Sequence, residues 1–251
     1  MTSTCRLLLL GRGPILKAFL EEAVSERIDL KGIDIEGFVG DDADMKLLRR
    51  LPKMAGKPIP YIPGDRREDK KILQTLKDFQ IDALLSIQYS WVLSGEILEE
   101  VRGRAYNLHN AKLPDYRGHH SLSHEILNGE KFHSVTIHRM DAIVDRGSLI
   151  FEETIAIRPD ETARSLGESS LSASMILLRR FCQALASGKL PEKRLTDGGK
   201  FYSRHLLEQM REIKSPASLE EISRKARAFH YPPHEPAYII IEGQKFYVTP
   251  S

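Results

Sequence analysis

Asn107 and His109 stand two residues apart in a short segment that can form an extended strand. In a strand, side chains at positions i and i+2 point to the same face, so the amide and the imidazole would lie together. An amide N–H and an imidazole can stabilise a developing oxyanion, and a carboxylate can set the imidazole's charge or help to move protons. Asp145, further along the chain, is the candidate carboxylate. Together the three groups suit acyl transfer to an amine.

Four other segments follow this pair, at residues 113–118, 128–130, 135–140 and 145–149. Their order and spacing resemble the 10-formyltetrahydrofolate-dependent formyltransferases. In that family an Asn-x-His at a strand end precedes a Leu-Pro-x-Tyr-Arg-Gly loop, and a Val-Thr-Ile-His-x-Met segment then leads to Asp-x-Gly. An isolated Asn-x-His occurs by chance in many chains, whereas five ordered pieces at family-like spacing are a specific signal.

The resemblance implies catalytic roles for Asn107, His109 and Asp145. The first two would bind and polarise the formyl carbonyl and then hold the oxyanion. Asp145 would lie close to His109, favour its cationic form and relay the amine's proton. The structural alternative is that Asn107 caps a turn and His109 is a core residue with satisfied hydrogen bonds.

The formyl donor, 10-formyltetrahydrofolate, must be held with its pterin buried. The resemblance places the pterin against residues 88–93 and 141–145. The candidate donor-binding residues are therefore Gln88, Tyr89, Trp91, Leu93, Asp141, Ile143 and Val144. Backbone groups usually make these contacts in the family, and ordinary packing at a cleft edge explains Tyr89, Trp91 and Leu93 equally well.

The acceptor side of the site has its own candidates, which are Arg117, Gly118, His119, His120, Gly11 and Arg12. Residues 119 and 120 border the acceptor in the family and are candidates for selectivity. Arg117 could contact an acidic substrate or pair structurally. Glycines before a helix can cradle a phosphate, but a tight strand-to-helix turn explains residues 11–13 equally well.

Two other site types are disfavoured. Residues 11–13 lack the third glycine and the acidic partner of a dinucleotide fingerprint, which argues against an NAD-dependent oxidoreductase. His120 and His124 are four residues apart, but no Cys or carboxylate arrangement completes a metal site, so no metal is expected.

The elements that would position these residues alternate between strands and helices. Strands are predicted at residues 6–10, 33–39, 59–62, 81–87, 105–109, 134–140 and 148–157 (the last with an early break), and helices from residue 14 and at 65–79, 94–101, 121–127 and 162–187. This alternation predicts an α/β fold with a doubly wound, Rossmann-like, mostly parallel sheet. A small extension follows, with a helix from Ser218 to about residue 229 and a hairpin at 238–248. The expected domains are a catalytic domain at 1–187, a linker at 188–204 and the extension at 205–251.

The composition argues against two further classes, nucleic-acid-binding proteins and membrane-spanning proteins. The chain has 251 residues, 41% hydrophobic and 29% charged, with a net charge of +2, which argues against a dedicated nucleic-acid surface. No apolar run approaches the roughly 20 residues of a membrane helix. Cys5 and Cys182 are expected to be buried free thiols, consistent with a reducing cytoplasm.

The acceptor expected from the resemblance is the primary amine of a nucleotide-linked amino sugar. The tRNA-formylating members continue into a β-barrel that this chain lacks, and hydrolases of the same donor usually begin with a regulatory domain for which there is no room before Arg6. Formyl transfer to methionyl-tRNA or another small amine, donor hydrolysis, and a catalytically silent folate-binding module remain the alternatives. A homodimer through the hairpin is also expected, because its strand edge is free to pair.

Overall fold

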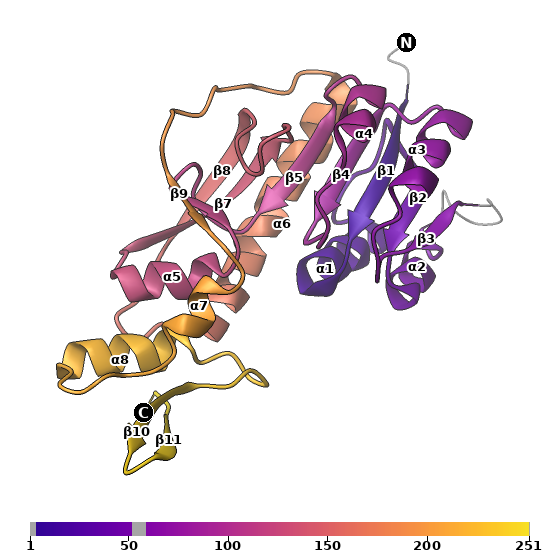
Figure 1. Ribbon diagram of the computed structural model, residues 1–251. Helices are drawn as coiled ribbons and strands as arrows, with labels where there is room; N and C mark the ends of the chain where they lie inside the picture. Colours follow the sequence, from indigo (N-terminus) through magenta and orange to yellow (C-terminus); the bar gives the residue numbers. More distant parts are fainter. Residues whose placement is uncertain (1–3, 52–58, 251) are drawn as a thin grey trace. The chain divides into compact units, whose positions relative to one another are not determined.

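The computed structural model describes residues 4–51 and 59–250, which form two compact units (Figure 1). The first unit combines residues up to 109 with 136–153 and 174–196, and the second combines 110–135, 154–173 and 197 onward. Three elements contribute residues to both units, namely strands β7 (Phe132–Arg139) and β8 (Leu149–Ala156) and helix α6 (Ala163–Ser187).

The central sheet has seven strands in the order β3-β2-β1-β4-β5-β7-β8. The first five strands are β1 (Cys5–Gly11), β2 (Ile33–Gly40), β3 (Tyr61–Pro63), β4 (Ala83–Ile87) and β5 (Ala105–His109). They pair in parallel, whereas β5 and β7 are antiparallel. The order 3-2-1-4-5 is that of a doubly wound sheet, so the predicted fold class is confirmed.

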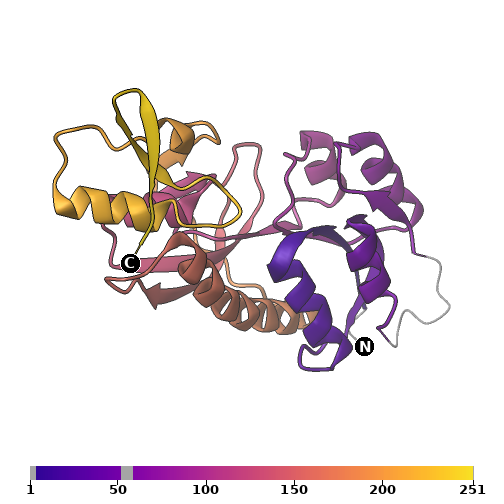
Figure 2. The ribbon, with the colours of Figure 1, turned by 90° about the horizontal axis from the view of Figure 1, so that it is seen from below.

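Apolar runs explain these strands. The four leucines of β1, residues 7–10, are completely buried, as expected for a parallel strand covered on both faces. The covering helices are α1 (Gly13–Val24), α2 (Asp42–Leu48), α3 (Asp69–Asp78) and α4 (Gly95–Glu100). Right-handed crossovers in a sheet of this order bring α1 and α2 to one face and α3 and α4 to the other, which Figures 1 and 2 show. Because they are parallel, β1 to β5 all end on the same side of the sheet, beside the starts of the helices.

The second unit is built around α5 (Ser121–Asn128) and α8 (Leu219–Ala228), which contact each other. Its other elements are a parallel pair, β6 (Tyr116–Gly118) with β9 (Lys200–Tyr202), the short helix α7 (Leu206–Gln209), and the hairpin β10 (Ala237–Ile241) with β11 (Gln244–Val248). The hairpin lies beside α8 in both views, and the two elements share a hydrophobic cluster (Figures 1 and 2). The predicted cap is present, because the side chain of Ser218 accepts a hydrogen bond from the Glu221 N–H.

Several elements differ from the sequence predictions. Helix α2 was not predicted. Strands β6 and β9 were not predicted either, because each has only three residues and is stabilised by pairing with the other. Strand β3 begins at Tyr61 rather than at residue 59, and α3 begins four residues later than expected, at Asp69. Strand β8 is continuous, without the expected break. The expected domain boundaries at residues 187 and 204 stay a prediction.

Both cysteines are buried free thiols, as predicted. Burial raises the pKa of Cys182 to about 12, so this thiol stays protonated at neutral pH. Within residues 4–51 and 59–250, no helix is both long and apolar enough to cross a membrane.

Candidate active site

Asn107 and His109 lie at the carboxyl end of β5 with partly buried side chains. The register of the sheet sets their neighbours. Ser86 of β4 stands beside Asn107 on one side, and His138 of β7 stands opposite it on the other. The two predicted site residues of β5 are thus brought together, and two polar side chains from the adjacent strands join them.

The Asn107 amide is held at both of its ends. Its Oδ1 accepts a hydrogen bond from the Ser86 hydroxyl at 2.9 Å, and its Nδ2 lies 3.2 Å from His138 Nε2. His138 Nδ1 lies 2.8 Å from the Arg139 carbonyl oxygen, which can only accept, so Nδ1 carries a proton. Nε2 of the neutral ring is then an acceptor for Asn107 Nδ2, which leaves the second Nδ2 hydrogen for a ligand.

Asp145 lies between two imidazoles. Its Oδ2 is 3.8 Å from His109 Nδ1, and its Oδ1 is 3.4 Å from His138 Nε2. The carboxylate is 8% exposed, so these charges interact with little screening by solvent. His138 Nε2 therefore faces both an amide donor and a carboxylate.

The backbone of residues 145–147 explains the Asp-x-Gly pattern. Asp145 has a left-handed conformation with φ 56°, which aspartate tolerates better than most residues. A Cβ on Gly147 would lie 1.8 Å from the Arg139 carbonyl oxygen, so only glycine lets the turn fold back on the end of β7. The pattern thus returns the carboxylate to the strand that carries His138.

Chemically, this arrangement presents an oriented amide N–H beside an imidazole, with a buried carboxylate behind the imidazole. Donors fixed in this way stabilise negative charge on an acyl oxygen without reorganising during the reaction. A carboxylate in contact with imidazoles can hold or move a proton. The arrangement suits acyl transfer.

The loop after β4 holds four of the candidate donor-binding residues. Tyr89 and Leu93 pack in one hydrophobic cluster with Met140, which leads into the second candidate segment, residues 141–145. Burial raises the pKa of Tyr89 to about 12, so its hydroxyl stays neutral. The side chain of Gln88 turns away from this cluster, because its Oε1 accepts a hydrogen bond from the Ile15 N–H in the first turn of α1.

Both candidate loops expose apolar side chains. Trp91 is 40% exposed and its neighbour Val92 59%, while Ile143 is 55% and Val144 36% exposed. The Asp141 carboxylate accepts a hydrogen bond from the next N–H in the chain and is exposed. Exposed apolar side chains concentrated on two loops are typical of a ligand-binding surface.

The turn at residues 11–13 is largely satisfied by the protein itself. The Arg12 N–H donates to the Ile87 carbonyl, and the Arg12 guanidinium donates to the Ser90 hydroxyl at 2.5 Å. The Gln88 side chain accepts a hydrogen bond from the Ile15 N–H. A phosphate at this turn would have to displace the Gln88 side chain, and a role in acceptor binding stays a prediction.

The remaining acceptor candidates lie in the second unit. Gly118 has φ 95°, and a Cβ there would come within 2.3 Å of the Tyr202 carbonyl oxygen, so glycine is required where β6 approaches β9. Arg117 donates to the Gly199 carbonyl at 3.4 Å. His119 and His120 are exposed, and His120 precedes α5. Residues 118 to 120 therefore lie where β6 ends, whereas the Arg117 side chain reaches the residue before β9.

Two residues of the site were missed by sequence reasoning. Ser86 is a buried polar residue in an apolar strand, and His138 is a buried histidine two residues beyond Thr136 on the same strand. Both signals are visible in the sequence. Neither residue could be assigned to Asn107 without the register of the sheet.

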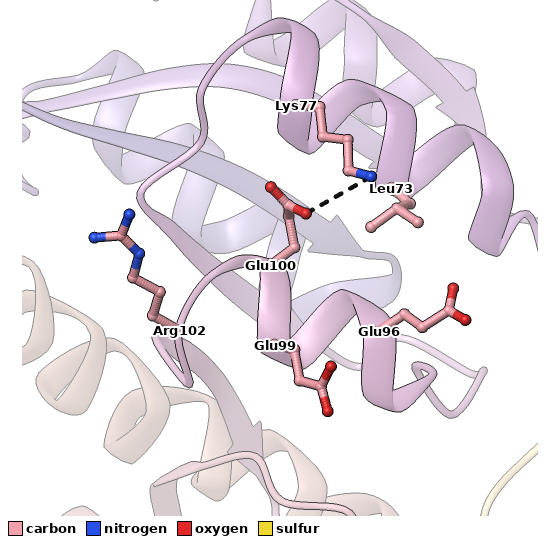
Figure 3. A pocket seen from close by; sticks show the side chains of 6 residues that line it. All are labelled: Leu73, Lys77, Glu96, Glu99, Glu100 and Arg102. Atoms are coloured by element: carbon pink, nitrogen blue, oxygen red, sulfur yellow. Dashed lines mark ion pairs between the residues drawn. The ribbon is translucent and has the colours of Figure 1, made fainter.

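A cavity of about 420 Å³ lies between α3 and α4 in the first unit (Figure 3). Its lining is mostly charged and comprises Leu73, Lys77, Glu96, Glu99, Glu100 and Arg102. Lys77 and Glu100 form an ion pair across it at 3.9 Å. Arg102 precedes β5, whereas Asn107 and His109 end that strand, so this cavity is not the candidate site. In the described part of the chain, no group of three or more His, Cys, Asp or Glu side chains is arranged to hold a metal ion.

The fold and the site together define a doubly wound α/β protein with a polar constellation at the carboxyl end of a central strand. The family model described as Formyl transferase matches residues 6–180, and the chain belongs to this family. The family predicted from the motif is therefore confirmed.

Known relatives extend this assignment. A GDP-perosamine N-formyltransferase from Brucella melitensis is 31% identical over 172 residues, which cover 68% of this chain and 65% of that protein. The chain thus matches less than two thirds of this relative's length. Among solved structures, a 4-N formyltransferase from Francisella tularensis has a TM-score of 0.78 at 17% identity, covering 98% of this chain and 97% of the other. An N-formyltransferase from Helicobacter canadensis in complex with folinic acid and dTDP-3-aminofucose has a TM-score of 0.67 at 19% identity, covering 96% and 86%. At these identities the structures show a shared fold.

Proposed function

We propose that this protein is an N-formyltransferase. It moves the formyl group of 10-formyltetrahydrofolate to a primary amine, that of a nucleotide-linked amino sugar. The observation that carries the proposal is the convergence of Asn107, His109 and Asp145 at one strand end, in a chain that belongs to the formyl transferase family.

Asn107 and His109 bind the formyl oxygen in this proposal. The free Nδ2 hydrogen of Asn107 and the imidazole of His109 donate to that oxygen as it gains negative charge. Ser86 and His138 support this role by holding both ends of the Asn107 amide, so that the donor is oriented before substrate arrives.

Asp145 transfers the proton of the attacking amine. The attacking amine must lose a proton and the departing donor nitrogen must gain one, and a carboxylate near His109 can accept the first and return it for the second. In its ionised form the same carboxylate stabilises a positive charge on His109, which strengthens the N–H donors of that imidazole.

The candidate loops fit the donor, which would supply a formyl group on a leaving nitrogen. A pterin is flat and apolar on its faces, and Trp91, Val92, Ile143 and Val144 offer exposed apolar surface on the two loops. Backbone groups of the same loops are available for the pterin's polar edge.

The acceptor is proposed from the relatives. One acts on GDP-perosamine by its name, and another was solved with dTDP-3-aminofucose; both compounds are amino sugars on a nucleotide. Methionyl-tRNA, another small amine, or water in place of the amine are the alternatives that the test below separates.

The test is formation of tetrahydrofolate from 10-formyltetrahydrofolate, measured with GDP-perosamine, with dTDP-3-aminofucose, with methionyl-tRNA and without acceptor. We expect turnover only with an amino sugar, and a loss of about a hundred- to thousand-fold in Asn107→Ala. Asp145→Asn should lose about a hundredfold or more. Asp160→Asn, which changes an exposed carboxylate of the other unit, is the matched control and should keep full activity.

Each other outcome selects an alternative. Tetrahydrofolate formed without any amine indicates a hydrolase, and turnover with methionyl-tRNA alone indicates the tRNA acceptor. Folate binding with no turnover under any of these conditions indicates another small amine as acceptor or a silent binding module.

We also propose that two copies of the chain pair through the hairpin. Ile240, Ile241, Phe246 and Tyr247 are about half exposed on it, and a two-stranded sheet has edges that can pair with another strand. A monomeric mass in solution at micromolar concentration contradicts this pairing.

A further inference from the structure

Strands β6 and β9 bring together basic residues from two parts of the chain, three of them just beyond the strand ends and the fourth, Lys200, at the start of β9. The register aligns Gly118 with Tyr202, and the His119 N–H donates to the Tyr202 carbonyl at 2.8 Å. The chain leaves β6 through His119 and His120 and leaves β9 through Ser203 and Arg204. Lys200 stands at the start of β9, with its Nζ 4.8 Å from the centre of the Tyr202 ring.

Two of these cations lack a carboxylate partner. Lys200 and Arg204 are exposed, and neither forms an ion pair within 4.0 Å among the described residues. Other cations of the same unit are paired, since Arg211 contacts Glu208 and Arg224 contacts Glu220. Cations without a carboxylate partner are available to an anion, and several of them around one site raise its attraction for negative charge.

The charges around His120 are mainly positive, which also favours binding of an anion here. The pKa of His120 lies below its usual value, first because of partial desolvation and then because of the positive neighbours His119 and Arg204. Glu208 opposes these effects, and His234 adds to them. More positive than negative groups therefore surround this imidazole.

A buried, unpartnered nitrogen lies in the same place. His124, in the first turn of α5, is 1% exposed, and its Nε2 has no hydrogen-bond partner among the described residues. Its ring lies 4.2 Å from that of Tyr202. Burial, His120 and Lys200 together lower its pKa to about 4, so the neutral ring faces two members of the basic set. A buried polar atom without a partner is costly unless a ligand or water satisfies it.

Helix α5 adds donors to this set. His120 precedes the helix in a left-handed conformation with φ 57°, and no side chain caps the helix. The backbone N–H groups of a first turn have no partners within the helix, and they favour anions. Arginine, imidazole and backbone N–H groups at one place are the donors that phosphate oxygens accept from most readily.

We propose that Lys200, Arg204, His119 and His120, with the start of α5, bind the diphosphate of a nucleoside diphosphate. This rests on the proposed function and names the part of the acceptor that the set recognises. The family match ends at residue 180, and β9 lies beyond it. Two of the four side chains thus come from the segment after the matched domain, so that segment contributes to the choice of acceptor.

The experiment is calorimetric titration of the full chain, without formyl donor, with pyrophosphate, GDP, dTDP and UDP, and with the corresponding nucleosides. The variants are Arg204→Gln, which removes a charge, and His120→Asn, which removes the imidazole but tolerates the left-handed backbone. Arg194→Gln is the matched control, because Arg194 is also exposed and forms no ion pair in the described structure.

We expect pyrophosphate and the nucleoside diphosphates to bind, with affinity about tenfold or more weaker in Arg204→Gln and His120→Asn. Nucleosides should bind poorly to every form, and Arg194→Gln should match the wild type. No diphosphate binding to the wild type, equal affinity in all variants, or an equal loss in Arg194→Gln would overturn the proposal. Tight binding of tRNA in place of nucleoside diphosphates would overturn it too.

Failure of this site and failure of the proposed function give different results. If diphosphate binding depends on Arg204 but no amine is formylated, the proposed formyltransferase function is wrong and the proposed diphosphate site stands. If an amino sugar is formylated but the affinity for diphosphates is unchanged in Arg204→Gln and His120→Asn, the proposed function stands and the proposed diphosphate site is wrong.

Discussion

His138 stands directly opposite Asn107 in the antiparallel pair of β5 and β7, and its Nε2 lies 3.2 Å from the Asn107 amide nitrogen. The same Nε2 lies 3.4 Å from Asp145. One buried imidazole therefore contacts two of the three proposed catalytic side chains. This makes His138 a positioning residue for the proposed reaction.

Replacing His138 should lower kcat far more than it raises the KM for either substrate. In His138→Phe, the Asn107 amide and the Asp145 carboxylate both lose a partner, and misplacement of a catalytic donor costs about a hundredfold in rate. His138→Gln should recover part of this loss, because its amide oxygen can accept from Asn107. Steady-state kinetics measure both constants, with His205→Gln as an exposed control. A rise in KM without a fall in kcat would assign His138 to substrate binding instead.

Trp91 should report donor binding. It is the chain's single tryptophan and is 40% exposed on a candidate donor loop. Folinic acid, a stable analogue of the donor, should shift and quench its emission, because a bound pterin would exclude water from the indole. Trp91→Phe should lose the signal while calorimetry still detects binding. Unchanged emission in the wild type at a folinic acid concentration where calorimetry shows saturation would place the pterin elsewhere.

Glu125 and His133 form a buried hydrogen-bonded pair that should contribute to stability. The two side chains are 1% and 0% exposed, with His133 Nδ1 2.5 Å from Glu125 Oε2. His133 Nε2 lies 3.2 Å from the Asn110 side-chain oxygen, directly after His109 in the chain. Glu125→Ala should lower the free energy of unfolding by about 3–5 kcal/mol, because it leaves a buried imidazole without its partner.

Urea unfolding measures this loss. Glu125→Leu combined with His133→Phe should cost less than Glu125→Ala, since no unpartnered polar side chain of the pair then remains buried. A double variant that is less stable than the single one would show that the pair contributes net stability.

His124 should make the protein less stable as the pH falls. Burial lowers its pKa from 6.5 to about 4, so the unfolded chain takes up a proton before the folded chain does. Stability from this group is complete above pH 6.5 and is lost as the pH falls towards 4, by about 3 kcal/mol in total. His124→Phe keeps a ring against Tyr202 but cannot titrate. The difference in unfolding free energy between the two proteins should change by about 3 kcal/mol between pH 7 and pH 4, against the wild type, and parallel pH dependences would show that His124 is not responsible.

The candidate site could be predicted only in part. Asn107 and His109 follow from alternation along one strand, and the structure does bring both to its end. Asp145 follows from the Asp-x-Gly pattern, and its distance to His109 could not be read from the sequence. Ser86 escaped prediction because nothing in the order of residues says which strands become neighbours.

The local amino-acid sequence alone determined the central strands and the long helix α6. The apolar periodicity and the turn residues that specify these elements lie within a few residues of one another. The sequence also determined the family, through five ordered motif segments. Only the tertiary structure decided that β6 and β9 are strands, that His138 faces Asn107, and that Arg204 approaches His120. Each of these depends on pairing between segments far apart in the chain, whose free energy comes from contacts that no local pattern encodes.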